Sequence, residues 1–211
     1  MQRLAVLLLM LLGLSAQADD WQLRHRDPAR DIRVYQRPHP GSPYNDVYAV
    51  TRLTASARDI ERILADVAGL PAWAPRVSAA RVIRRQGNQA WIHLVYQLPY
   101  PFKPRDVVVL TERSDVDGQI TLRSQAVRGL LRERPPTVRL YSLSSTWRLT
   151  GLPDGQLRIE LWGSGEPGGI IPAMLYNYNV GEEALQTLRQ LRRMADRRKY
   201  PDDPSASDDS P

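Results

Sequence analysis

The sequence contains no cysteine, only one phenylalanine and only three histidines. Without cysteine there is no disulfide, no thiolate nucleophile and no zinc site built on sulfur, so we expect packing alone to hold the fold. His25, His39 and His93 lie far apart and form no H-x-x-x-H pair, and no G-x-S-x-G nucleophile motif occurs. We therefore expect no metal, no cofactor and no catalytic residues.

The first 18 residues have the pattern of an export signal. Arg3 supplies a positive charge, residues 4–14 are apolar and uncharged, and Ala16-Gln17-Ala18 has the small-x-small pattern that precedes a cleavage site. The apolar run is much shorter than the about 20 residues that cross a bilayer, so an uncleaved anchor is the less favoured alternative. We expect cleavage after Ala18 and export across the inner membrane, into the periplasm.

The charge of the chain is unevenly distributed. The net charge is +6, yet leaving out Arg3 and the four aspartates of residues 201–211, 28 basic and 19 acidic residues remain. Such a basic body favours transient contact with an anionic lipid surface. The charges are scattered without interleaved aromatics, which argues against nucleic acid as a partner. Residues 201–211, rich in Pro, Asp and Ser, are expected to form a disordered acidic tail. A protein-partner-binding module that uses the basic face or this tail remains an alternative.

Hydrophobic periodicity predicts an α+β domain over residues 19–200. Ile60, Ile63, Leu64 and Val67 share a helical face behind Ser56, which is placed to cap that helix. A long amphipathic helix follows Pro172, and only the sheet is available to cover its apolar stripe. The stripe consists of Ala173, Asn177, Val180, Ala184, Leu188, Leu191 and Ala195. Alternation predicts strands at 31–37, 44–53, 79–85, 89–98, 105–114, 119–127, 138–149 and 156–162, in largely sequential antiparallel order.

Three stretches of the chain resemble START (StAR-related lipid-transfer) domains. They are residues 70–75 (LPAWAP), residues 98–106 (LPYPFKPRD) and residues 168–172 (GGIIP), the last of which leads to Asn177. The resemblance spans about residues 20 to 198 and implies a helix-grip fold, in which a curved sheet wraps around the C-terminal helix. It also implies a tunnel between sheet and helix that holds one lipid. We expect the protein to be a monomer without enzymatic activity.

The resemblance places a loop of residues 100–104 over the tunnel mouth. Tyr100, Phe102 and Lys103 belong to this loop, and an aromatic ring beside a cation suits a membrane interface. A Phe102 that merely fills the core is the alternative. Strand alternation allows only one of Arg105 and Asp106 to face the tunnel. The resemblance favours Arg105, whose guanidinium is suited to a phosphate or hydroxyl head group, with a structural ion pair as the alternative.

Further bulky or polar side chains are candidates for the tunnel wall, although ordinary core packing is an alternative for each of them. These candidates are Trp91, His93, Tyr96, Trp147 and Asn177. Residues 91–98 contain no acid, whereas some sterol-binding relatives place a carboxylate opposite the arginine. A phospholipid or fatty acid is therefore favoured over a sterol, for transfer or sensing outside the cytoplasm.

Two enzymatic functions are the remaining alternatives. Residues 163–168 match G-x-G-x-x-G, but no second parallel strand follows to complete a dinucleotide-binding unit, so we reject a cofactor. A cyclase or aromatase-like enzyme acting on a polyketide or another hydrophobic substrate is the stronger rival, because related folds orient such substrates with a few polar side chains. The expected export signal argues against it.

Overall fold

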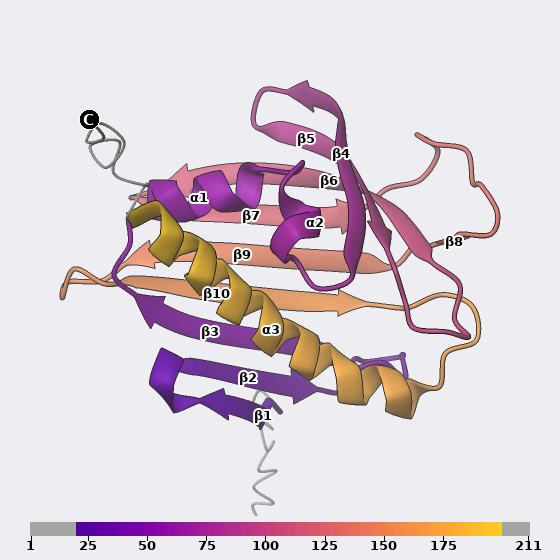
Figure 1. The fold of residues 1–211 in the computed structure, drawn as a ribbon, viewed down its shortest axis with the longest axis horizontal. Helices are drawn as coiled ribbons and strands as arrows, with labels where there is room; N and C mark the ends of the chain where they lie inside the picture. Colours follow the sequence, from indigo (N-terminus) through magenta and orange to yellow (C-terminus); the bar gives the residue numbers. More distant parts are fainter. Residues whose placement is uncertain (1–19, 200–211) are drawn as a thin grey trace, which may run out of the picture.

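The computed structural model describes residues 20–199, so the expected export signal and acidic tail lie outside the described residues. One curved sheet carries all its α-helices on one face (Figure 1). Its elements in chain order are β1 (Gln22–Asp27), η1 (Pro28–Arg30), β2 (Ile32–Arg37), β3 (Asp46–Leu53), α1 (Ala57–Ala65), α2 (Leu70–Trp73), β4 (Val77–Gln86), β5 (Gln89–Tyr96), β6 (Arg105–Val116), β7 (Gln119–Ala126), β8 (Val138–Arg139), β9 (Leu143–Gly151), β10 (Leu157–Gly165) and α3 (Ala173–Lys199). None of these helices is both long and apolar enough to cross a bilayer.

The strands follow the order β1-β2-β3-β10-β9-β7-β6-β5-β4, and only the short β8 pairs in parallel, with β6. Residues 54–76, with α1 and α2, carry the chain from β3 to the opposite edge of the sheet (Figure 1). From there the strands return until β10 pairs with β3. The antiparallel, helix-grip class predicted from the sequence is confirmed.

Two details of the sequence prediction are wrong. Gln22–Asp27 forms an edge strand, which was not predicted because its side chains are mostly exposed and show no apolar alternation. The strand predicted over 138–149 divides into β8 and β9, since residues 140–142 leave the ladder. The largely sequential order is confirmed, with its main break where the helical crossover brings the N-terminal strands beside β10.

Helix α3 packs against one half of the sheet. Leu188 and Leu191 are completely buried, and Ala184, Leu185 and Ala195 are nearly so, against strands β2, β3, β9 and β10. Burial of each leucine contributes about 1.5–3 kcal/mol, which makes this stripe the main attachment of the helix. Ile60 and Ile63 of α1 join the same core, and the Ser56 hydroxyl accepts the amide of Asp59 as the expected helix cap.

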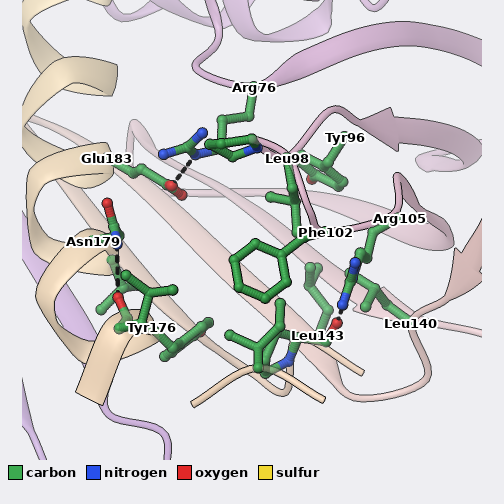
Figure 2. A pocket seen from close by; sticks show the side chains of 15 residues that line it. Arg76, Tyr96, Leu98, Phe102, Arg105, Leu140, Leu143, Tyr176, Asn179 and Glu183 are labelled. Carbon is green, nitrogen blue, oxygen red and sulfur yellow. Dashed lines mark hydrogen bonds and ion pairs between the residues drawn. The ribbon is translucent and has the colours of Figure 1, made fainter. Parts of the chain in front are cut away.

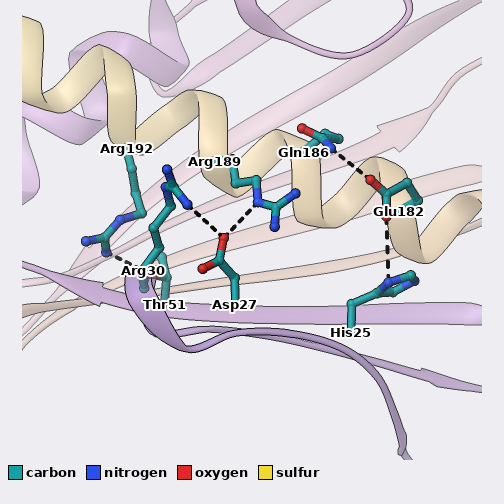
Figure 3. A network of polar contacts seen from close by, with 8 residues as sticks. All are labelled: His25, Asp27, Arg30, Thr51, Glu182, Gln186, Arg189 and Arg192. Carbon is teal, nitrogen blue, oxygen red and sulfur yellow. Dashed lines mark hydrogen bonds and ion pairs between the residues drawn. The ribbon is translucent and has the colours of Figure 1, made fainter.

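Polar contacts fix the C-terminal half of α3 to the first strands (Figure 3). The buried carboxylate of Asp27 accepts hydrogen bonds from Arg189 Nε at 2.8 Å and from Arg30 Nη1 at 3.2 Å. Arg192 Nη1 donates to Thr51 Oγ1 at 3.0 Å. The bond from Arg189 is the main reason that the pKa of Asp27 lies below its ordinary value. The register of the helix on β1 to β3 is thereby specified.

Asn177 fixes the other half of the helix. Its Oδ1 accepts the amide of Asn45 at 2.8 Å, its Nδ2 donates to the carbonyl of Pro43 at 3.0 Å, and its own carbonyl accepts Gln36 Nε2 at 2.9 Å. One turn later Gly181 lies so close to β2 that a Cβ there would be 2.6 Å from Gln36 Nε2. A larger residue at position 181 would therefore require the side chains of Gln36 and His25 to move.

A buried ion pair joins β8 to β6 on the outer face of the sheet. Arg139 donates to Asp106 through Nε at 3.0 Å and Nη2 at 2.8 Å, and His93 Nε2 lies 2.8 Å from the same carboxylate. Burial by itself would raise the pKa of Asp106, but the bonds from Arg139 and His93 outweigh it and hold the pKa below the ordinary 3.8. The ionised carboxylate therefore stabilises the fold.

We expect Arg139→Leu to lower the free energy of unfolding at pH 7 by about 3 kcal/mol, because it leaves Asp106 charged and unpaired in a buried place. A depressed pKa contributes stability that is lost as pH falls through the folded pKa, so the gap between variant and wild type should narrow below about pH 3.8. Urea denaturation at both pH values measures this. Arg123→Leu, at an exposed position on β7, is the control. A gap that stays constant with pH would contradict this account.

Candidate functional site

A cavity of about 400 Å³, partly open to solvent, lies beside the N-terminal half of α3. It lies where β4 to β6 extend the curved sheet beyond the strands against which α3 packs (Figure 1). Its walls come from the end of β5, the loop that follows, the start of β6, residues 140–143, the turn after β10 and the first turns of α3. The site therefore combines segments that are far apart in the sequence.

Most of the lining is apolar. Leu98, Leu140, Leu143, Ile171 and Val180 contribute aliphatic side chains from four different segments. The ring of Phe102 points into the middle of the cavity, with Arg105 on one side and an ion pair between Arg76 and Glu183 on the other (Figure 2). Such a surface can bind a hydrocarbon group without any chemical step, since each buried methylene contributes about 0.8 kcal/mol.

Arg105 is the one cation of the lining that has no carboxylate partner within residues 20–199. Its guanidinium is buried and donates to three backbone carbonyls: from Nε to Pro167 at 3.0 Å, from Nη2 to Gly168 at 2.9 Å, and from Nη1 to Lys103. Desolvation lowers its pKa. The buried positive charge is thus solvated only by carbonyl dipoles, and an anion at the cavity wall would stabilise it further.

Two glycines in the turn after β10 help to place the carbonyls that accept hydrogen bonds from Arg105. Gly168 and Gly169 have φ values of 63° and 61°, a left-handed conformation that costs other residues about 1–2 kcal/mol each. A Cβ on Gly168 would lie 3.3 Å from Val138 Cγ1, and one on Gly169 would lie 3.4 Å from Arg105 Nη2. Gly168, the last glycine of the rejected dinucleotide pattern, therefore serves together with Gly169 to turn the chain from β10 towards α3.

The remaining polar lining is neutral or paired. Glu183 accepts a hydrogen bond from Arg76 Nε, which connects α3 to the segment before β4. Burial raises the pKa of Tyr96 to about 12, and it also raises the pKa of Tyr176. Both phenols are therefore uncharged at neutral pH and can donate a hydrogen bond to a bound molecule.

The structure places the residues predicted for the site in different surroundings. Tyr96, Phe102 and Arg105 line the cavity, whereas Tyr100 and Lys103 are exposed in the same loop. Trp147 lines a second cavity beneath α1 and α2. Trp91 and His93 point to the outer face of the sheet, where Trp91 lies under the guanidinium of Arg84 and His93 bonds to Asp106. The side chain of Asn177 forms hydrogen bonds with the backbone of the loop before β3 and does not line the cavity.

Several lining residues were not predicted from the sequence. On α3 they are Tyr176, Asn179 and Glu183, which lie on a helical face adjacent to the predicted stripe, whereas the lining residue Val180 belongs to that stripe. Arg76 has a left-handed φ of 60°, which no sequence pattern indicates. Only the helical spacing provided a signal that could have found these residues.

Solved structures with the same architecture identify the family. A STAR-related lipid transfer protein from Xanthomonas axonopodis superposes with a TM-score of 0.78 at 30% identity, over 84% of this chain and 99% of that chain. The chain belongs to the START (StAR-related lipid-transfer) family. The family resemblance drawn from the three short sequence stretches is confirmed.

More distant START structures show the same fold. Human StAR-related lipid transfer protein 5 gives a TM-score of 0.76 at 14% identity, covering 87% of this chain and 90% of that chain. Human STARD10 gives 0.75 at 16% identity, covering 84% and 73%. The uncharacterized protein PA1579 of Pseudomonas aeruginosa is 29% identical over 199 residues, which are 93% of this chain and 98% of that protein. No family sequence model matches the chain.

We expect Gly168→Ala to destabilise this START domain by about 1 kcal/mol and to displace the carbonyls that hold Arg105. Gly129→Ala is the matched control, because Gly129 has a φ of 82° and a Cβ added there would meet nothing within 4 Å. Denaturation should show similar losses for both variants. The ¹⁵N–¹H resonance of Arg105 Nε should shift only in Gly168→Ala. An unchanged resonance would show that the hydrogen bonds from Arg105 to these carbonyls do not depend on the conformation of this turn.

Proposed function

We propose that the protein binds a single lipid with an anionic head group, a fatty acid or phospholipid in preference to a sterol, and carries or senses it outside the cytoplasm. The observation that carries this proposal is the buried Arg105 at the wall of an apolar cavity, without a carboxylate partner in the described chain. The lipid-transfer names of START relatives and the signal-like first 18 residues support it.

Charge distinguishes an anionic lipid from a sterol as the ligand. The pair of Arg76 and Glu183 is neutral overall, so Arg105 leaves the lining with a net positive charge. A carboxylate or phosphate would neutralise that charge in a place shielded from water, where a guanidinium contact is strong. A sterol hydroxyl would provide a single weak acceptor. The cavity is therefore matched to an anion followed by hydrocarbon.

The lining supports binding without catalysis. It contains no serine, threonine, histidine or cysteine, and its one carboxylate, Glu183, is paired with Arg76. The described residues also hold no group of acidic and histidine side chains suited to a metal. A nucleophile with an adjacent base, the usual arrangement for covalent catalysis, is missing from this cavity in the described chain.

An exposed apolar rim surrounds the cavity and is our candidate for transient membrane contact. Tyr100 is 97% exposed, Ile170 94%, Met174 84% and Tyr178 77%. Tyr100 adjoins Phe102 in the loop after β5, Ile170 lies in the turn before α3, and Met174 and Tyr178 lie in its first turns, close in sequence to the cavity residues Ile171 and Leu175. Exposed apolar side chains gathered at one place mark interaction sites, and a lipid surface is the partner that the basic chain fits.

Native mass spectrometry of the purified protein should show one lipid-sized adduct per chain, and hexadecanoate should bind about tenfold or more tightly than hexadecanol. Arg105→Met should remove that preference without abolishing hexadecanol binding, whereas Arg105→Lys should retain it in part. Calorimetric titration provides both affinities. A protein without an adduct that also takes up no fluorescent lipid from vesicles would refute lipid binding.

We expect Met174→Asp to slow lipid uptake from anionic vesicles several-fold while leaving the affinity for dissolved fatty acid unchanged, because the charge opposes insertion of the rim. Val116→Asp is a matched control, since Val116 is also an exposed aliphatic residue but lies at the β6–β7 turn. Stopped-flow transfer of a fluorescent fatty acid measures both rates. Equal rates in the two variants would show that this rim is not the docking surface.

A further inference from the structure

Within residues 20–199 no α-helix covers the outer face of the sheet (Figure 1), and this face holds a polar basin of about 430 Å³. We propose that the basin binds a phosphate monoester of a small polar molecule, of the sugar phosphate type, through the guanidiniums of Arg33, Arg52 and Arg158. Such a site is separate from the lipid cavity and adds a second ligand to the proposed function.

Strand alternation separates the basin from the lipid cavity. Ile32 and Ala49 belong to the core beneath α3. Their neighbours Arg33 and Val50, which pair across β2 and β3, therefore face the opposite side of the sheet. Leu152, in the hairpin between β9 and β10, lines the basin, whereas the lipid cavity includes the turn that follows β10. The two sites thus lie on opposite faces and at opposite ends of β10.

The basin forms above a short side chain. Val50 of β3 is 8% exposed and lies at its floor. Longer side chains from three neighbouring strands surround it, namely Arg33 and Tyr35 of β2, Tyr48 and Arg52 of β3, and Arg158 of β10. Because Val50 is much shorter than any of these neighbours, a hollow remains between them.

The arginines of the basin have more donors than the protein uses. Arg52 Nε donates to Asp31 at 2.7 Å, and Arg33 Nη2 lies 3.6 Å from the same carboxylate. The guanidinium of Arg33 forms no hydrogen bond with any of residues 20–199. Arg158 Nη2 donates to Glu160 at 2.8 Å. Since a guanidinium has five N–H donors, most of the donors around the basin remain free for a ligand.

Two of these arginines are directly opposed. Arg52 of β3 pairs with Arg158 of β10, and like charges at such a position repel each other because neighbouring strands are only about 5 Å apart. Asp31 and Glu160 offset part of this repulsion. An anion held between the two guanidiniums would offset more of it, and its oxygens would accept charge-assisted hydrogen bonds from both.

A phosphate monoester matches the number of guanidiniums. It carries about two negative charges at neutral pH and three strong acceptor oxygens, whereas a carboxylate has one charge and two oxygens. Three guanidiniums, contributed by three strands, line the basin beside the single carboxylate of Asp31. The stronger anion is therefore the better fit.

The tyrosine wall leaves room for the organic part of the ligand. Tyr48 stacks between Tyr35 and Trp162, with ring centroids 5.7 and 4.9 Å away, and its hydroxyl donates to Glu160 at 2.7 Å. These contacts hold the wall in place. The hydroxyl of Tyr35 bonds to none of the described residues and is free to donate to a polyol. The volume also lies within the roughly 300–1,000 Å³ of small-molecule sites.

Calorimetric titration with glucose 6-phosphate should show binding to the wild type, whereas glucose should not bind. Arg33→Gln should weaken the affinity by about tenfold or more, because a charge-assisted contact is lost, and Arg33→Lys should retain part of it. Arg123→Gln is the matched control. It removes the same charge from an exposed position on the same face, on β7, and should leave the affinity unchanged.

Arg52→Gln should weaken binding as well, which keeps the test valid if denaturation shows that Arg33→Gln does not fold. Equal weakening by Arg33→Gln and Arg123→Gln would show that only the general positive charge attracts the phosphate, and would overturn the basin as a site.

Vesicles distinguish a soluble ligand from a lipid head group. Phosphatidate presents a phosphate monoester at a membrane surface, whereas phosphatidylglycerol presents a diester. If the free sugar phosphate does not bind but cosedimentation shows a preference for phosphatidate vesicles that Arg33→Gln removes and Arg123→Gln retains, the monoester belongs to a lipid head group. If wild type prefers neither glucose 6-phosphate nor phosphatidate, the proposal fails, and lipid binding in the other cavity stands.

Discussion

The attachment of α3 to only one half of the sheet is the constraint on which the site depends. The helix is long and the sheet is twisted and curved, so the apolar stripe of α3 cannot contact every strand. Leu188 and Leu191 fix it over β2, β3, β9 and β10, and the bond between Asp27 and Arg189 specifies its position along them. Strands β4 to β6 lie outside this packed half, although Arg76 just before β4 still contacts Glu183 of α3, and a cavity remains between these strands and the helix.

The same geometry explains the position of the charge. Arg105 opens β6 at the end of the sheet where the chain also turns from β10 into α3. The left-handed Gly168 and Gly169 bring that turn close enough for two of its carbonyls to accept the guanidinium. One turn thus holds the guanidinium of Arg105, leads into α3 and leaves Ile170 exposed beside the cavity. In the function we propose, this turn would therefore link anion binding to membrane contact.

Much of the architecture could be predicted from local patterns. The stripe through Ala184, Leu188, Leu191 and Ala195 is buried as expected, and Ser56 caps α1. Both depend on interactions between residues three or four positions apart, which a sequence displays directly. The edge strand β1 was missed because an exposed strand needs no apolar alternation. The pairing of β3 with β10 was missed because it joins segments separated by about a hundred residues.

For the site too, some features follow from the sequence and others only from the tertiary structure. The sequence by itself determined the family, the amphipathic helix, and a choice between Arg105 and Asp106 that strand alternation makes exclusive. Only the tertiary structure decided that Trp91 and His93 face outwards, that Asn177 bonds to a loop and that Arg105 lies at the wall of a cavity. The physical reason is that a side chain's periodicity is local, whereas an empty volume exists only where several distant segments fail to meet.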